Sequence, residues 1–352
     1  MSEAPTASAA NGSLEPAPTP LLFRDVVGWY AIAILAIGRE TGMLDAAING
    51  PVTARSLASA CNVDARNADA WLGAMTAHGY LAHLDGTYTM PQFEAASFRG
   101  EAVPFDLGAI IDCCHRLPGT MAAVAGAVRT GSGVDPSVYH ESLGDAVGRV
   151  NAPLYRLLLG RWLEQAGVEQ DLQRGVDVAD IGCGLGNALL DLAGRYPASQ
   201  FTGYDVNSVA LGRATAEARE RGLTNIRFQA AEANSVSGSW DIVLVLDAFH
   251  HFPHPETFLE CIGGCLKPGG VLLFVEAAAT GNVDVDASSP FARILFSANL
   301  LICLQEALHD GGAGTGALAG EKRIISLLNA GGFANVNTYE TGVGYTIFAA
   351  RR

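Results

Sequence analysis

From Gly175 onward, short apolar runs alternate with amphipathic helical patterns. Apolar runs of about four to eight residues are typical of buried strands, and strands that alternate with helices predict a parallel sheet covered on both faces. We expect strands at 176–181, 200–204, 226–229, 241–246 and 271–275, and helices at 187–195, 208–221, 256–265 and 321–329. Segments 334–341 and 343–350 flank Gly342 and predict a terminal hairpin. This half of the chain is therefore expected to be an α/β domain.

Residues 284–320 interrupt this order with a largely apolar helix followed by a glycine-rich run, which indicates an inserted, partly mobile cap. At about 150 residues per domain, 352 residues predict two domains. We place a flexible tail at 1–20, a helical dimerisation domain at 21–165, and a ligand-binding domain at 166–352 that carries the cap.

The segment from Leu21 to about Gly50 reads as one long helix that is apolar almost all round. Such a helix must be covered on every side, which favours a homodimer. Its longest apolar run, Val26 to Ile37, is too short for a bilayer and has charged residues on both sides. We therefore expect a buried helix and no membrane partner.

A winged-helix pattern follows this first helix. Thr53 and Asp64 are positioned to cap two successive short helices, and two short strands flank the Asp85-Gly86 turn. DNA binding is disfavoured because only Arg55 and Arg66 lie between residues 53 and 91, against Asp64, Asp69 and Asp85.

The whole chain is acidic, with 22 Lys and Arg against 36 Asp and Glu, a formal net charge of −14. Such a chain repels phosphate backbones and anionic lipid, so we expect no nucleic-acid or membrane partner. Seven cysteines without paired CxxC motifs predict reduced thiols and a cytoplasmic location. Cys261 and Cys265 read as two core positions on a helix, and we assign no metal ligand.

The stretch Asp180-Ile181-Gly182-Cys183-Gly184-Leu185-Gly186 holds the most chemical information. A buried strand runs into three alternating glycines and then a helix, so that backbone can approach a ligand closely. Dinucleotide sites favour a third glycine where Asn187 stands here. Asp180 suits a cationic ligand better than a pyrophosphate.

Asp205 ends the second strand about twenty residues after the glycines. A carboxylate at this place can accept both hydroxyl groups of a ribose. The alternative is a helix N-cap. Together with the glycine turn, the spacing favours the ribose.

These motifs, with Ala231-Glu232-Ala233 and Leu266-Lys267-Pro268-Gly269-Gly270, resemble class I S-adenosylmethionine-dependent methyltransferases. The N-terminal half resembles the winged-helix dimerisation domain of small-molecule methyltransferases of bacterial specialised metabolism. The resemblance implies a Rossmann-like seven-stranded sheet with an antiparallel last strand, preceded by a mainly α-helical winged-helix domain.

The resemblance also implies S-adenosyl-L-methionine as cofactor and S-adenosyl-L-homocysteine as product. The implied cofactor contacts are Asp180, Gly182, Gly184, Gly186, Asp205, Val206, Glu232, Ala233 and Asp247. His250-His251-Phe252 resembles the His-Asp-Trp triplet of related O-methyltransferases, whose histidine is the base. His250 is then the expected base, with His251 as the alternative, and Glu276 the carboxylate that orients it.

The expected activity is methyl transfer to a small aromatic or heteroaromatic acceptor, with O-methylation slightly favoured. One alternative is a C-methyltransferase acting on an electron-rich heteroaromatic carbon such as an indole. A second is a winged-helix regulator that responds to S-adenosylmethionine. A third is a dimerising partner that has lost cofactor binding, which the intact glycines and Asp205 oppose.

Overall fold

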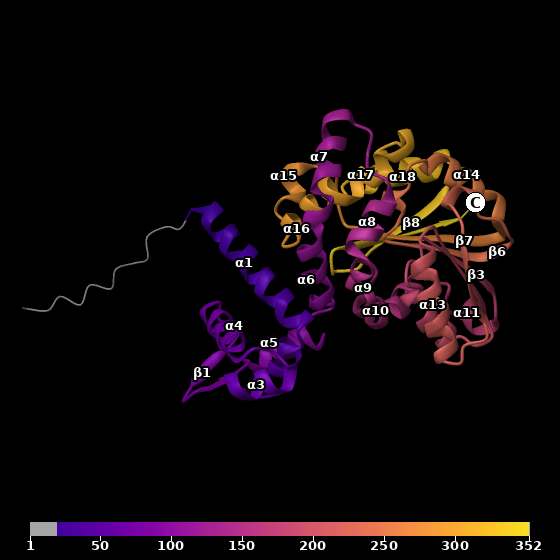
Figure 1. Ribbon diagram of the computed structural model, residues 1–352. Helices are drawn as coiled ribbons and strands as arrows, with labels where there is room; N and C mark the ends of the chain where they lie inside the picture. The colour runs from indigo at the N-terminus through magenta and orange to yellow at the C-terminus, as the bar shows by residue number, and fades with distance from the viewer. Residues whose placement is uncertain (1–19, 352) are drawn as a thin grey trace, which may run out of the picture. The chain divides into compact units, whose positions relative to one another are not determined.

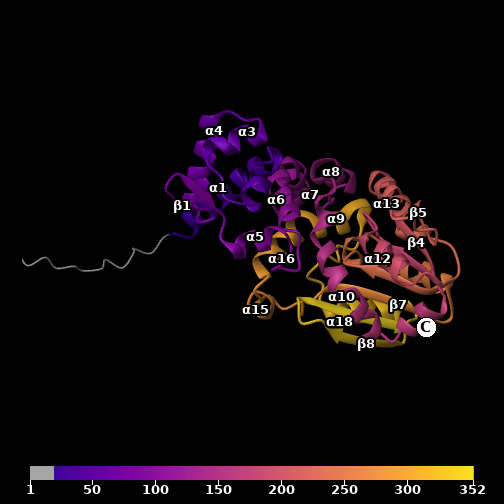
Figure 2. The ribbon, with the colours of Figure 1, turned by 90° about the horizontal axis from the view of Figure 1, so that it is seen from below.

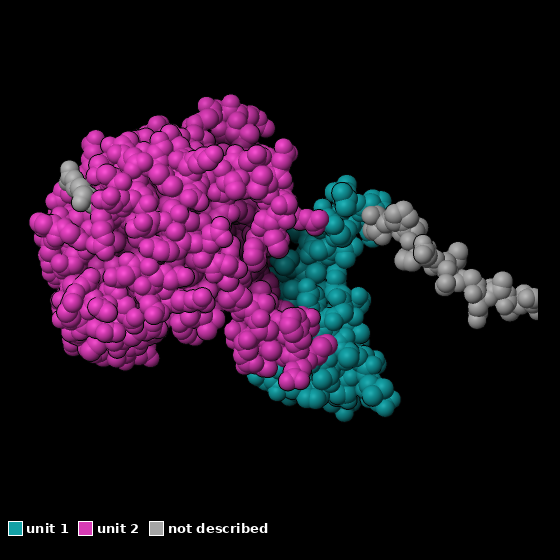
Figure 3. All heavy atoms as spheres, turned by 180° about the vertical axis from the view of Figure 1, so that it is seen from behind, with its two compact units in different colours: residues 1–90 teal, residues 91–352 magenta. Residues whose placement is uncertain are grey.

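The computed structural model describes residues 20–351, so almost all of the predicted tail at 1–20 lies outside the described residues. The chain forms two compact units, residues 1–90 and residues 91–352 (Figure 3). This division differs from the one expected at 165/166. The helix Ala152–Gln165 belongs to the second unit, since its Trp162 and Leu163 lie in the core beneath the sheet.

The first unit begins with two helices where one was expected. α1 spans Leu21–Glu40 and α2 spans Met43–Ile48. Between them Gly42 has φ +76°, a left-handed conformation that favours glycine and ends a helix. The prediction of one helix to Gly50 is therefore wrong.

Helix α1 is also largely exposed within its own chain. Its buried residues are Ala31, Leu35, Ala36 and Gly38, all in the C-terminal half. Trp71 holds that half by donating its indole N–H to the Ile34 carbonyl oxygen at 2.9 Å. The exposed large apolar residues are Leu21, Leu22, Phe23, Val26, Val27, Trp29, Tyr30 and Ile37. The expectation of a buried helix is thus wrong for the single chain.

By length and composition alone, α1 could cross a membrane, although this is weak evidence because core helices and signal sequences show the same property.

The winged-helix layout in this unit is confirmed. It consists of α3 (Ala54–Cys61), α4 (Ala65–Ala77), β1 (Ala82–Leu84) and β2 (Thr87–Thr89). Thr53 caps α3 through a capping box, and the Asp64 carboxylate accepts from the first backbone N–H groups of α4. Asp85 and Gly86 both have positive φ, as the tight hairpin turn requires.

The second unit is built on a seven-stranded sheet of order β5-β4-β3-β6-β7-β9-β8. Its strands are β3 (Asp177–Ile181), β4 (Gln200–Asp205), β5 (Ile226–Ala230), β6 (Trp240–Leu246), β7 (Leu266–Ala277), β8 (Asn335–Glu340) and β9 (Tyr345–Arg351). The last strand, β9, pairs antiparallel with both β7 and β8, while β3 to β7 pair in parallel. The predicted fold is confirmed, and β5 and β8 form the two edges (Figure 2).

Both faces of the sheet are covered, because successive residues of a strand point to opposite faces. Val178 belongs to a core with α10 (Ala152–Gln165), α11 (Glu169–Arg174) and α12 (Asn187–Arg195). Ala179 belongs to the opposite core with α14 (Pro255–Cys265) and α18 (Glu321–Ala330). Helix α13 (Ser208–Glu220) connects β4 to β5.

Helices precede and interrupt the sheet in the second unit (Figure 1). Before it lie α5 (Gln92–Phe98), α6 (Leu107–Arg116), η1 (Leu117–Thr120), α7 (Met121–Thr130), α8 (Pro136–Leu143) and α9 (Ala146–Val150). The inserted cap contains α15 (Val283–Asp286), α16 (Ala292–Ala298), a π-helix at Asn299–Cys303, α17 (Leu304–Leu308) and η5 (His309–Gly311). Tyr139 of α8 donates its hydroxyl to the Leu301 carbonyl oxygen at 2.8 Å, which ties the cap to the preceding helices.

Candidate active site

The glycine turn follows β3 and leads into α12. A Cβ on Gly182 would lie 2.7 Å from the Ala248 methyl carbon, and one on Gly186 would lie 2.6 Å from the Phe228 ring. These two glycines are therefore required by packing within the chain. Gly184 differs, because its φ is +53° and nothing lies within 4 Å of where its Cβ would be. Open space beside the turn lies at Gly184.

Asp205 holds this turn in place. One carboxylate oxygen accepts the Gly184 backbone N–H at 2.7 Å, and the other accepts the Asn207 N–H at 2.8 Å. The N-cap of α13 is Asn207, whose side chain accepts from the Ala210 N–H, so the N-cap alternative for Asp205 is wrong. The half-buried carboxylate keeps further acceptor capacity, since each oxygen has two lone pairs.

Asp180 is 2% exposed, and its Oδ1 has no hydrogen-bond partner. Burial, and next the Asp205 carboxylate, raise the pKa of Asp180 to about 8. A buried carboxylate oxygen without a donor is costly. The site therefore favours a ligand that brings a cationic N–H group to Asp180.

Of the other predicted cofactor contacts, two are exposed and two are partly or largely covered. Val206 and Glu232 are exposed, and Ala233 is half-buried in η2 (Ala233–Ser235). Asp247 follows β6 with φ +55°, and its carboxylate accepts from the Asn151 amide at 2.7 Å and the Tyr345 hydroxyl at 3.2 Å. Burial raises the pKa of Asp247.

His250 and Glu276 form a buried pair at the ends of β6 and β7. His250 lies in η3 (Phe249–His251), and its Nδ1 contacts one oxygen of Glu276. The other Glu276 oxygen accepts the Phe249 backbone N–H at 2.9 Å, which fixes the carboxylate. Burial lowers the pKa of His250, but the Glu276 carboxylate outweighs it, and the pKa rises to about 9.

His251 has a carboxylate partner that sequence reasoning missed. Its Nδ1 lies against Glu306 of α17, as a charge contact without hydrogen-bond geometry. Burial and the neighbouring His250 lower the pKa of His251, but Glu306 raises it, to about 10. The rings of His250 and His251 are 4.1 Å apart between centroids, and Cys303 lies beside them. No local pattern in the sequence connects the cap residues Glu306 and Cys303 with these histidines.

Two family models match the chain. Residues 179–272 match a methyltransferase domain, and residues 30–99 match an Rv2258c-like winged HTH domain. A curated relative, the fatty-acid O-methyltransferase of Mycolicibacterium smegmatis, is 28% identical over 168 residues, covering 48% of this chain and 56% of the relative. The chain spans between about a third and just over half the length of the first curated relatives that it matches.

Solved structures show the same fold over nearly the whole chain. An O-methyltransferase family protein from Burkholderia thailandensis aligns with TM-score 0.70 and 17% identity over 96% of this chain and 99% of its own. Human N-acetylserotonin methyltransferase in complex with SAM aligns with TM-score 0.67 and 20% identity over 97% and 99%. The chain thus resembles a methyltransferase domain over residues 179–272 and a winged HTH domain over residues 30–99, and it shares the fold of these solved methyltransferases.

Proposed function

We propose that this chain transfers a methyl group from S-adenosyl-L-methionine to a small acceptor. The observation that carries the proposal is the buried Asp180 oxygen that lacks a donor, in β3 just before the turn that leaves open space at Gly184. The methionine part of the cofactor offers an ammonium group that can donate to Asp180. Asp205 has the acceptor capacity to bind the ribose hydroxyls. We assign the adenine to Glu232 and Ala233, and a further cofactor contact to Val206.

When bound, the cofactor supplies a methyl group on a sulfonium, whose thioether leaves without needing a proton. The chain then has to orient the acceptor and exclude water, which are large contributions to such a displacement. A base is needed only where the acceptor must lose a proton. The match to curated O-methyltransferases supports transfer to oxygen. We take the acceptor to be a small hydroxyl-bearing molecule of the aromatic or heteroaromatic class, as the sequence resemblance implies. Methylation at carbon is the alternative.

We assign the proton of a hydroxyl acceptor to the neutral form of His250, whose population grows as the pH rises toward its raised pKa of about 9. Its Nδ1 is engaged by Glu276, so Nε2 is the nitrogen that remains for the acceptor. Glu276 is a positioning residue. Its second oxygen accepts the backbone N–H of Phe249, the residue before His250, so the carboxylate is fixed relative to the His250 ring. His251 is the alternative base at the same place.

The exposed apolar face of α1 supports a homodimer, since a second copy would cover Trp29, Tyr30 and their neighbours. The seven cysteines are free, which supports a reducing, cytoplasmic location.

Calorimetry with S-adenosylhomocysteine tests the cofactor assignment, and mass spectrometry of products formed from labelled S-adenosylmethionine and a panel of small phenols and indoles tests the activity. We expect micromolar binding and a mass gain of one methylene unit. A chain that binds NAD and ignores S-adenosylhomocysteine contradicts the proposal.

A further inference from the structure

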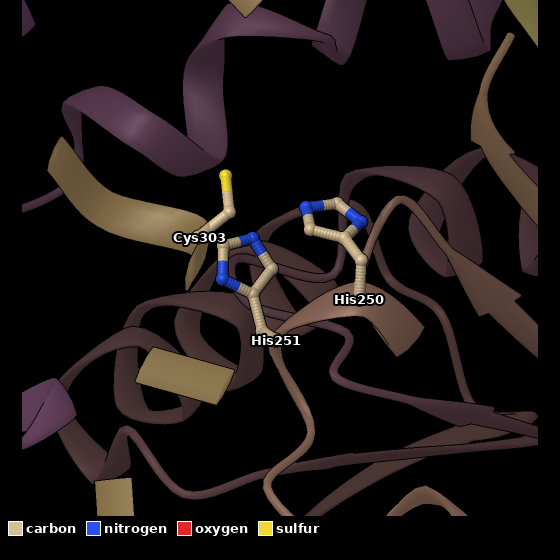
Figure 4. A group of neighbouring side chains, drawn as sticks. All are labelled: His250, His251 and Cys303. Atoms are coloured by element: carbon tan, nitrogen blue, oxygen red, sulfur yellow. The ribbon is translucent and has the colours of Figure 1, made fainter. Parts of the chain in front are cut away.

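Three potential metal ligands converge where the loop after β6 meets the cap. His250, His251 and Cys303 each offer one ligand atom, and these atoms lie within 4.8 Å of one another. Figure 4 shows the edges of the two imidazole rings facing each other, with the Cys303 side chain next to them. The three side chains come from two elements far apart in the sequence, η3 and the π-helix at Asn299–Cys303.

The Nδ1 atoms of both histidines are already engaged by carboxylates. Glu276 holds Nδ1 of His250, and Glu306 lies against Nδ1 of His251. The nitrogen that each ring leaves for a ligand is therefore Nε2. A carboxylate behind a histidine orients the ring and strengthens it as a ligand, and such pairs are common in metalloproteins.

Cys303 stands at the end of a π-helix, a rare distortion that is often found at functional sites. Its side chain is buried, whereas His251 is half-buried. The site is thus largely shielded from water but not sealed. Cys261 and Cys265 form no comparable cluster, because both thiols donate to the Val236 carbonyl oxygen.

We propose that His250, His251 and Cys303 bind one divalent transition-metal ion, through the two Nε2 atoms and the Cys303 Sγ. Two imidazoles and a thiolate suit Zn²⁺, Fe²⁺ or Co²⁺ rather than Mg²⁺ or Ca²⁺. Ligand atoms around a tetrahedral ion are roughly 3.3–3.8 Å apart at the usual bond lengths, so the three side chains must close by up to about 1.5 Å. Three protein ligands leave the fourth position for water or for an oxygen of the acceptor.

The metal site is inferred from these three residues and does not depend on the proposed function. The suggestion that an acceptor oxygen binds to the ion does depend on it. In the ion-loaded chain His250 Nε2 is a ligand and accepts no proton. The base role assigned to His250 above therefore belongs to the metal-free chain.

Cobalt titration of the chelator-treated full chain tests the site without cofactor or acceptor. We expect one Co²⁺ per chain and a thiolate-to-cobalt charge-transfer absorption. Cys303→Ser should lose that absorption, while the matched control Cys114→Ser, at an exposed cysteine, should keep it. Cys303→His should bind one Co²⁺ without the absorption, which separates loss of the thiolate from loss of the fold. Glu306→Gln should bind Co²⁺ about 10–100-fold more weakly, because His251 loses the negative charge beside its Nδ1.

The absence of the charge-transfer absorption in the wild-type chain, or its survival in Cys303→Ser, overturns the metal site. Binding of S-adenosylhomocysteine by the metal-free chain is measured separately. Its failure would count against the proposed function and leave the cobalt result unaffected.

Discussion

Replacing Asp205 with alanine removes the carboxylate on which the glycine turn and the proposed ribose contact both depend. The Gly184 and Asn207 N–H groups lose acceptors at 2.7 and 2.8 Å, and the ribose loses an ionised acceptor. Hydrogen bonds to charged groups contribute about 1.5–3 kcal/mol each. Part of this loss also destabilises the free protein, so we expect cofactor binding to weaken by about 2–3 kcal/mol, or roughly 30- to 150-fold.

Calorimetry with S-adenosylhomocysteine measures this loss. Asp205→Asn is the conservative comparison, because its amide keeps one oxygen and should lose less affinity than alanine. Glu232→Gln, at an exposed side chain, should change the affinity less than either. An Asp205→Ala affinity within threefold of the wild type would refute the ribose assignment.

The remaining predictions concern other parts of the molecule. Because the folded-state pKa of Asp180 is raised to about 8, binding of the cofactor's ammonium group should release a proton, and S-adenosylhomocysteine affinity should rise from pH 6 to 8; a flat profile contradicts this. For the same reason the contribution of Asp180 to stability should fall as pH rises from about 4 to 8, and Asp180→Asn should show a higher Tm than the wild type at pH 8. In the metal-free chain, His250→Ala should lower kcat by about 10²–10⁴-fold with S-adenosylhomocysteine affinity nearly unchanged, and His251→Ala should cost less; the reverse order transfers the base role to His251. Sedimentation should show a dimer at micromolar concentration that Trp29→Glu with Tyr30→Glu weakens, and a wild-type monomer contradicts the α1 interface.

Local patterns predicted most of the sheet and its helices. Helix 187–195 has the expected bounds because the glycine turn begins it and Pro197, which follows the C-cap Tyr196, ends it. The two capped helices of the winged-helix pattern were equally predictable. Thr53 and Asp64 accept hydrogen bonds from backbone N–H groups only two or three residues further along the chain, so local sequence is sufficient to identify them.

The failures concern features that local sequence does not encode. The helix from Leu21 ends early because Gly42 adopts a left-handed conformation, while the hydrophobic pattern continues across it. Glu306 and Cys303 reach the histidines only through the packing of the cap, and neither has a motif around it. The glycines of the turn were predictable as a group, but only the structure separates Gly184 from the two that packing requires.

The place of β9 in the sheet has a consequence for the order in which the molecule assembles. β9 lies between β7 and β8, and Thr346 of β9 pairs with Glu276 of β7. During synthesis β7 therefore keeps one unpaired edge until β9 leaves the ribosome, although the strands on its other side are already complete. Open strand edges invite pairing with other chains. The nascent protein is thus most prone to aggregation after β7 has formed and before β9 has paired with it. During that time Glu276, which contacts His250, lies on an unpaired strand edge.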